Sequence, residues 1–306
     1  MPQEAVPAYI QHDGKLSALY QAMNQIAPLS MADTSWDNVG VQIQAPEPEK
    51  NKGNVIMLCE DLRTAVVDEA LERGDVAIIM TYHPIIFRGL KSLTFNDTQQ
   101  KSLLRLTAAN ISVYAAHTSL DASTNGLNDW LARVVSNQQS DVVKSDTPSN
   151  SLPPAIEPLT KSYESHPNAG QGRIVELKEA ISVDQLVSNI KSNLQLKNVI
   201  LGLPHNFDPK EARLTNIAVG AGSAGSIVTK YPKAQAYVTG ELSHHEALAA
   251  VEKGIVVITT LHGNSERGYL RQVLVNKLEK TLASINSGTP LKVVASQTDS
   301  EPLEIV

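Results

Sequence analysis

Residues 254–269, GIVVITTLHGNSERGY, show most clearly how this chain is built. The first seven form an apolar run of strand length, and from Ser265 onward apolar residues recur at helical spacing. The stretch therefore predicts a buried strand, a turn and a helix. His262 falls in the turn and Glu266 in the first helical turn, so an imidazole and a carboxylate can approach one point. This pairing suits a divalent cation, and its alternative is a structural hydrogen bond.

The same alternation of apolar runs and helical patterns extends along the chain. Further strands are expected at residues 54–59, 76–80, 111–115, 173–177, 198–201, 214–219, 236–239 and 291–295. Because most of these runs are continuously apolar, we expect mostly parallel sheets covered by helices on both faces. The plan occurs twice, so the sequence predicts an α/β fold made of two similar, intertwined lobes.

A change of composition separates the two halves. Residues 137–172 are rich in Ser, Pro, Asn and Gln, a composition typical of a flexible linker. We therefore predict a first lobe at 1–136, a linker at 137–172 and a second lobe at 173–306, with the C-terminal helix and strand packing back on the first lobe.

Composition excludes several classes of protein. The 306 residues carry 26 Lys and Arg against 32 Asp and Glu, a net charge of -6, which argues against direct nucleic-acid binding. No apolar run of about 18 residues is present, so no membrane segment is expected. A single cysteine, Cys59, excludes an intramolecular disulfide and a cysteine-based zinc site. We expect a cytoplasmic protein, with a nuclear location also compatible, and we assign Cys59, Trp36 and Trp130 to packing.

Histidine is scarce, with eight in the chain, yet three follow expected strands closely. These are His83, His117 and His262, and ligands bind beyond the carboxyl ends of parallel strands. With Asp121 and Glu266 they form a set of nitrogen and oxygen ligands that suits one or two ions of zinc, manganese, iron or nickel. A water bound between two such ions becomes a nucleophile. The alternatives are that His83 caps a strand and that His117 and Asp121 form a hydrogen-bonded pair.

Two further stretches are candidates for a functional role. Glu241, His244 and His245 open the helix expected at 242–253, where they either line the metal site or form an exposed polar first turn. In the first case Glu241 and His245 are candidate catalytic residues. Residues 220–226, GAGSAGS, are expected to form a close strand-to-helix turn, and phosphate binding by their backbone is the alternative.

Several short motifs occur in the order in which a known family carries them. They are Trp36-Asp37-Asn38-Val39-Gly40, His83-Pro84-Ile85-Ile86-Phe87, His117-Thr118-x-x-Asp121 with Gly126-Leu127-Asn128-Asp129-Trp130-Leu131, Gly220-Ala221-Gly222-Ser223, Gly240-Glu241 and His262-x-x-x-Glu266-Arg267-Gly268. The chain resembles the family of the NGG-one-interacting factor three, whose bacterial relatives carry the label GTP cyclohydrolase I type 2 homologue. The resemblance runs from about residue 16 to the C-terminal end, apart from residues 136–172.

The resemblance implies a dinuclear metal centre in a cleft between two α/β lobes, and a ring-shaped homo-oligomer, commonly a hexamer. It places the metal ligands, with His117 adjacent, at His83, Asp121, His262 and Glu266. The chain departs from the bacterial pattern His-His-Pro by having Tyr82 before His83, as in the eukaryotic branch. A phenol, with its reference pKa near 10, is a poorer ligand than imidazole, so the number of ions is one or two.

Two functional hypotheses follow, ahead of a third, a nucleotide-binding module that uses the turn at 220–226. The first is a metal-dependent hydrolase-like protein of unknown substrate, acting by cyclohydrolase-type, phosphoester or amide hydrolysis. In this scheme His117 or Glu241 moves protons and the turn at 220–226 holds a small anionic substrate. The second is a non-catalytic, metal-bearing regulatory or metal-delivery protein with protein partners in transcription regulation, as the family name implies.

Overall fold

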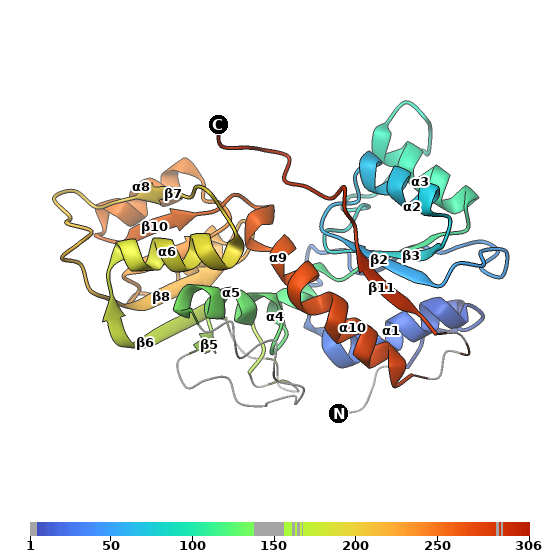
Figure 1. Ribbon diagram of the computed structural model, residues 1–306, viewed down its shortest axis with the longest axis horizontal. Coiled ribbons are helices and arrows are strands. Elements are labelled where there is room, and N and C mark those ends of the chain that lie inside the picture. Colours follow the sequence, from blue (N-terminus) through green and yellow to red (C-terminus); the bar gives the residue numbers. More distant parts are fainter. Residues whose placement is uncertain are drawn as a thin grey trace. The chain divides into compact units, whose positions relative to one another are not determined.

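The computed structural model describes residues 5–137, 156–160, 163, 166, 168–285, 288 and 290–306. The chain divides into two compact units, each built on its own sheet (Figure 1). Unit 1 contains Met1–Leu120 and Leu270–Ser300, and unit 2 contains Asp121–Tyr269 and Glu301–Val306. The predicted α/β class with two sheets is confirmed. Among the described residues, no helix has the length and apolar character needed to cross a membrane.

The sheet of unit 1 has five strands in the order β1-β4-β3-β2-β11. Four of them are parallel, and β1 pairs with β4 in antiparallel fashion at the edge. The strands are β1 (Gly40–Ile43), β2 (Val55–Cys59), β3 (Val76–Thr81), β4 (Ser112–Ala115) and β11 (Lys292–Ala295). All residues of β2, β3 and β4 are buried, as expected for parallel strands covered on both faces.

Helices cover both faces of this sheet, with α1 and α10 on one side and α2 and α3 on the other (Figure 1). They are α1 (Gly14–Ile26), α2 (Thr64–Arg73), α3 (Thr98–Ala108) and α10 (Val275–Ala283), and the short α4 (His117–Ala122) follows β4. Local sequence sets their ends. The side chain of Asp13 accepts hydrogen bonds from two backbone N–H groups of the first turn of α1, and Gly74 ends α2 at a φ of 69°.

The sheet of unit 2 has six strands in the order β5-β6-β8-β9-β10-β7. The central strands β8, β9 and β10 are parallel, and the outer strands are antiparallel to their neighbours. The strands are β5 (Ile156–Pro158), β6 (Arg173–Ile181), β7 (Ile200–Gly202), β8 (Leu214–Gly220), β9 (Ala236–Thr239) and β10 (Val256–Thr259).

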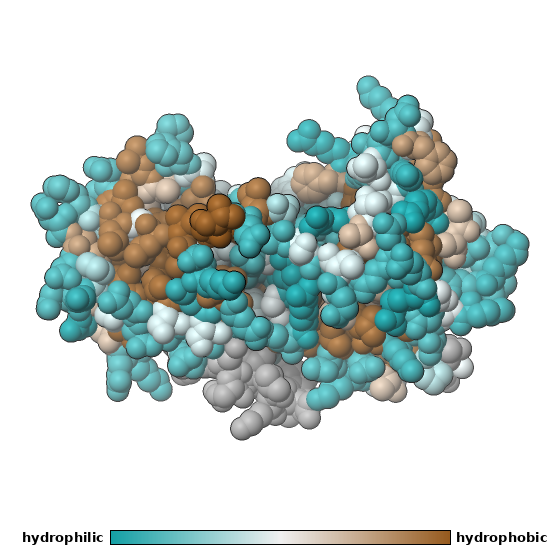
Figure 2. All heavy atoms as spheres, turned by 45° about the horizontal axis from the view of Figure 1, so that its top comes forward, coloured by the Kyte–Doolittle hydropathy of each residue, from teal (hydrophilic) through white to brown (hydrophobic). Residues whose placement is uncertain are grey.

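The helices of unit 2 are α5 (Leu127–Ser136), α6 (Val183–Leu194), α7 (Gly225–Val228), α8 (His244–Glu252) and α9 (Arg267–Tyr269). Helix α5 packs on α6 and on strands β6 and β8, whereas α8 packs on β10. A π-helical turn, Leu270–Leu274, connects α9 to α10. The edge strand β7 exposes Ile200 and Leu201, and Figure 2 shows hydrophobic residues gathered on one face of unit 2.

The units group the chain differently from the ranges expected from sequence. Helix α5, expected in the first lobe, packs in unit 2, where Asn189 and Asn193 of α6 donate to its Val135 and Val134 carbonyls. Helix α10 and strand β11 belong to unit 1. Most of the linker expected at 137–172 lies outside the described residues, and its described part contains β5, which pairs with β6.

A buried ion pair joins α5 to β6 inside unit 2. The Arg173 guanidinium donates to the Asp129 carboxylate, and neither side chain is exposed to solvent. The other N–H groups of the Arg173 guanidinium donate to the backbone carbonyls of Ser123, Gly170 and Gly172. A buried charge is tolerated only when it is paired and hydrogen-bonded, so the site depends on both partners being present.

We expect Arg173→Met to lower the free energy of unfolding by about 3–5 kcal/mol, because the Asp129 carboxylate would stay buried without its partner. Urea denaturation followed by circular dichroism measures the change. Arg213→Met is the matched control, because Arg213 is exposed and donates to the nearby carbonyls of Lys210 and Ala212, and its expected change is within about 0.5 kcal/mol. Equal stability of the two variants would contradict the role assigned to the pair.

Candidate metal centre

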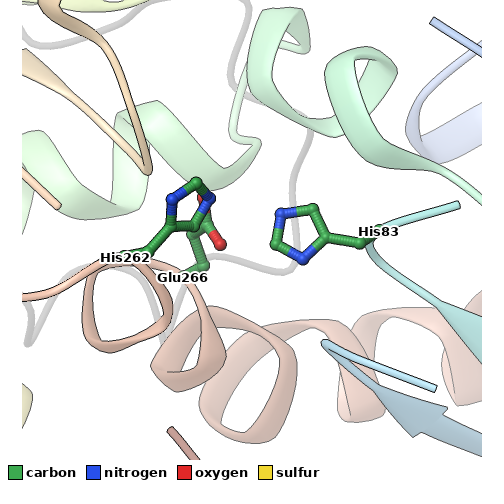
Figure 3. Close-up of side chains that lie close together, drawn as sticks. All are labelled: His83, His262 and Glu266. Carbon is green, nitrogen blue, oxygen red and sulfur yellow. The ribbon is translucent and has the colours of Figure 1, made fainter. Parts of the chain in front are cut away.

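In unit 2, His262 and Glu266 lie together at the end of β10. Leu261 reverses the chain with a φ of 72°, and a 3-10 turn at Gly263–Ser265 leads into α9. The His262 Nε2 atom lies 3.5 Å from Oε1 of Glu266, which is 2% exposed (Figure 3). The imidazole nitrogen and the carboxylate oxygen therefore face one point, as the strand-turn-helix pattern predicts.

Gly222 leaves room for these two side chains. The residue follows β8 with a φ of 60°, and a Cβ atom there would lie 2.8 Å from His262 Nε2 and would also collide with Glu266 Oε1. Its N–H donates to the Ser265 hydroxyl at 2.8 Å, and its carbonyl accepts from Glu241 N at 3.0 Å. A glycine at this position is required both by the backbone conformation and by the close approach of the ligand atoms.

The turn at 220–226 is a close strand-to-helix turn, as expected. Three of its N–H groups bond inside the unit, from Ala221 to the Asn128 side chain, from Gly222 to Ser265 and from Ala224 to the Thr239 hydroxyl. These three N–H groups are therefore not available to an anion, and the binding of a small anionic substrate by this turn stays a prediction.

In unit 1, His83 lies just beyond β3 and pairs with a carboxylate that follows β2. The His83 Nδ1 atom is 2.9 Å from Oδ1 of Asp61. Glu60, Asp61 and His83 each offer a ligand atom within 4.8 Å of the others, which makes them a candidate metal-binding group. Sequence analysis missed Glu60 and Asp61, although they directly follow the strand expected at 54–59.

His117, the first residue of α4, bonds to Asp37 and not to Asp121 as the alternative interpretation supposed. Its Nδ1 atom is 2.8 Å from Asp37 Oδ1, and Asp37 Oδ2 accepts from the Thr118 N–H and hydroxyl. Burial raises the pKa of Asp37, but the hydrogen bonds from His117 and Thr118 and the charge of His117 outweigh it and lower the pKa overall. Asp37 therefore stays ionised at neutral pH.

The third carboxylate is Glu241, whose Oε1 atom lies 2.8 Å from Nδ1 of His262. All three histidines thus have Nδ1 at a carboxylate, which favours the tautomer that carries the proton on Nδ1. The lone pair then resides on Nε2, the arrangement common among metal-ligating histidines. Glu241, expected from sequence to move protons, is placed so as to orient His262.

Sheet topology explains each pair. Cys59 is in register with Thr81 in the parallel strands β2 and β3, so Asp61 and His83, two residues further on, lie side by side. Thr239 and Thr259 are in register in β9 and β10, which brings Glu241 next to the residues after β10. Strand β1 is antiparallel to β4, with Gly40 opposite Ala115, so Asp37 before β1 meets His117 after β4. Adjacent strand ends supply the histidine and its carboxylate in every case.

Two predicted site residues, Asp121 and His245, are not members of the three histidine–carboxylate pairs. Asp121 lies in α4, where its backbone carbonyl accepts from the Asn128 side chain at 3.1 Å, and among the described residues it joins no group of three candidate ligands. His245 is exposed in the first turn of α8, with its ring against that of His244. Ser243 caps this helix, so His245 fits the alternative of an exposed polar first turn.

Tyr82, at the position that is histidine in the bacterial pattern, is 2% exposed. Its ring centroid lies 4.8 Å from that of His83 and 5.4 Å from that of His117. The two imidazole rings are themselves 5.2 Å apart at an angle of 66°. Tyr82 therefore packs edge-on against both histidines and holds the spacing between them.

Cys59, Trp36 and Trp130 were expected to be packing residues, and this is confirmed for Cys59 and Trp130. Trp130 is 2% exposed and packs near Tyr269, and Cys59 is buried, which raises its thiol pKa well above the usual value. The expectation is wrong for Trp36, whose side chain is 50% exposed in a loop of unit 1. Exposure of this kind depends on tertiary structure and has no marker in the sequence.

Comparisons with known proteins agree with this architecture. The model of the Duf34/NIF3 (NGG1p interacting factor 3) family matches residues 14–302. The chain is 39% identical over 287 residues to the protein NIF3 homolog of Schizosaccharomyces pombe, covering 94% of this chain and 96% of that protein. It is 34% identical over 300 residues to NGG1-interacting factor 3 of Saccharomyces cerevisiae, covering 95% and 97%.

Solved structures show the same fold. A Bacillus cereus protein related to NIF3 matches with a TM-score of 0.72 at 18% identity, over 94% of this chain and 98% of that one. Reduced HcgD from Methanocaldococcus jannaschii matches with a TM-score of 0.66 at 25% identity, over 89% and 94%. With its two sheets, its paired histidines and carboxylates and this similarity along nearly its whole length, the chain belongs to the Duf34/NIF3 family.

Proposed function

We propose that this chain binds one or two divalent ions of zinc, manganese, iron or nickel, and that the metal-loaded protein is a hydrolase-like enzyme. The proposed ligands are His83, Asp121, His262 and Glu266. The observation that carries the proposal is the Nδ1–carboxylate hydrogen bond, which is repeated at three histidines that follow strand ends. Such pairs orient the ring and raise the basicity of Nε2 toward a metal.

The chemistry of the residues fits a borderline divalent ion. His262 and Glu266 offer an imidazole nitrogen and a carboxylate oxygen at one point, and Gly222 keeps that point clear of a side chain. In unit 1, His83 offers a further imidazole nitrogen, with its Nδ1 atom held by Asp61. Nitrogen and oxygen donors without thiolate suit zinc, manganese, iron or nickel. A dinuclear centre is the arrangement that the family resemblance implies.

When bound, the metal would supply Lewis-acid polarisation and a water of lowered pKa. The chain itself contributes a proton acceptor. Asp37 is ionised and holds His117 through Nδ1, so Nε2 of His117 accepts a proton and the resulting imidazolium is stabilised by the Asp37 carboxylate. Glu241 orients His262, and His245 is the remaining candidate for proton transfer.

A second candidate function is a non-catalytic role in regulation, metal delivery or transcription. It is supported by the name of the Saccharomyces cerevisiae relative, NGG1-interacting factor 3, which describes a protein partnership.

A homo-oligomer, with the hexameric ring implied by the resemblance, fits the apolar edge of unit 2 at β7, where Ile200 and Leu201 are exposed. The single, buried cysteine is compatible with a cytoplasmic or nuclear location.

We expect the double variant His262→Ala/Glu266→Ala to lose bound metal, because it removes an imidazole and a carboxylate that face one point. Metal per chain is measured by elemental mass spectrometry after incubation with zinc and removal of excess. The matched control is His205→Ala/Glu211→Ala, which removes an exposed pair of the same residue types from unit 2. One or two ions in parent and control and a clear loss in the double variant are predicted. An unchanged zinc content in the double variant would refute the ligand assignment.

Glu241→Gln is expected to weaken zinc binding by about 10- to 100-fold, because the amide keeps the shape of the side chain but accepts the Nδ1–H of His262 more weakly and orients the ring less firmly. Competition with a chromogenic zinc chelator gives the dissociation constant. Glu252→Gln, an exposed change of the same kind on α8, is the control and should bind zinc as the parent does. Equal constants for both variants would mean that the hydrogen bond to His262 is structural only.

His117→Gln separates the two candidate functions. The variant is expected to bind zinc as the parent does and to lower metal-dependent turnover by about 100-fold or more, because it removes a proton acceptor and not a proposed ligand. A panel of phosphoester, amide and cyclic amidine substrates is tested with the metal-loaded protein, with His205→Gln as control. No turnover of any substrate by the parent, together with partner binding that is lost in the double variant, would favour the regulatory function.

A further inference from the structure

An exposed aromatic pair lies beside His117 in unit 1. Trp36 is 50% exposed and Phe87 is 45% exposed, and their ring centroids are 5.9 Å apart at an angle of 57°. The ring of Trp36 also meets that of His117 in an edge contact, with centroids 5.6 Å apart at 82°. Large aromatic side chains exposed next to a polar cluster are common at ligand sites.

Hydrogen bonds hold the two loops that carry the rings. The Trp36 backbone N–H donates to the Asp33 carbonyl at 3.4 Å. The Asn38 side chain donates to the Ile86 carbonyl, next to Phe87, which ties together the two loops that carry the rings. Loops that are already joined lose little entropy when a ligand binds, so the backbone that carries the pair is organised before binding.

The surroundings of the pair favour a small ligand over a protein surface. The imidazoles of His117 and His83 and the buried carboxylate of Asp37 lie next to the rings. The cores of protein interfaces are depleted of charged groups, whereas small-molecule sites combine apolar walls with a few polar groups. A ligand stacked on Trp36 has its next atoms within reach of His117.

We infer that Trp36 and Phe87 form a stacking platform for a substrate that contains a flat, conjugated ring, with the reacting group held toward His117 and His83. The ring system is of the class of planar nitrogen heterocycles, which join a π-face to polar edge atoms. This inference rests on the proposed function, because it assigns the substrate class of the same site. Aliphatic phosphoesters and simple amides without a ring are then poor substrates.

Tryptophan fluorescence tests the platform, because the chain has two tryptophans and the other one, Trp130, is buried. Metal-stripped protein is titrated with adenosine, with nicotinamide and, as the ringless control, with ribose. Saturable quenching by at least one ring compound and none by ribose is expected. Equilibrium dialysis should show binding about tenfold or more weaker in Trp36→Leu, which removes the stacking ring, and nearly unchanged in Trp36→Phe, which keeps one.

Phe95→Leu is the matched control, because Phe95 is exposed in the same unit and has no assigned role, and it should bind like the parent. No saturable quenching by either ring compound, or equal binding by Trp36→Leu, would overturn the inference. Acrylamide quenching of Trp36 that increases when the protein is diluted would also overturn the inference. It would mean that a second copy of the chain covers the aromatic pair at high protein concentration. Because ring binding is measured on metal-stripped protein and zinc uptake is measured separately, the two proposals can fail independently. Zinc uptake without ring binding refutes the platform alone. Ring binding without zinc uptake refutes the metal centre alone.

Discussion

The hydrogen bond between a histidine Nδ1 and a carboxylate, repeated at His83, His117 and His262, is the interaction on which the candidate centre depends. It favours one tautomer, restricts the ring and leaves the lone pair on Nε2. The fold produces the pair in the same way each time, because the two members follow or precede neighbouring strands whose ends are in register. Each sheet therefore creates its own histidine–carboxylate pairs without any long insertion.

Close packing around His262 and Glu266 limits which residue can occupy position 222. Gly222 must be a glycine, because a larger residue would occupy the point that His262 and Glu266 face. Its N–H and carbonyl are bonded to Ser265 and Glu241, so the loop after β8 and the turn after β10 form one hydrogen-bonded structure. The Arg173–Asp129 pair supports it from within the unit by fixing α5 on β6. Rigid support of this kind holds ligands in a geometry that a metal can use.

Sequence alone predicted most of the fold, because long apolar runs and helical periodicity are local properties. Strand β9 matches its expected range of 236–239, and β2, β3, β8 and β11 match theirs to within a residue. The short strand β5 and the π-helical turn at Leu270–Leu274 have no such periodicity and were not expected. Asp37 and Asp61 were missed as histidine partners because the strand order that brings them to His117 and His83 is not encoded locally. The exposure of Trp36 likewise follows from tertiary packing.

The central claim is that the carboxylates select Nε2 as the ligand atom, and diffraction from zinc-loaded crystals at the zinc absorption edge tests it most directly. The account predicts an anomalous peak about 2.0–2.2 Å from Nε2 of His262 and from a carboxylate oxygen of Glu266, with Glu241 still at Nδ1. A zinc ion bound to Nδ1 of His262, with Glu241 displaced, would contradict it. So would an ion that contacts neither His262 nor Glu266.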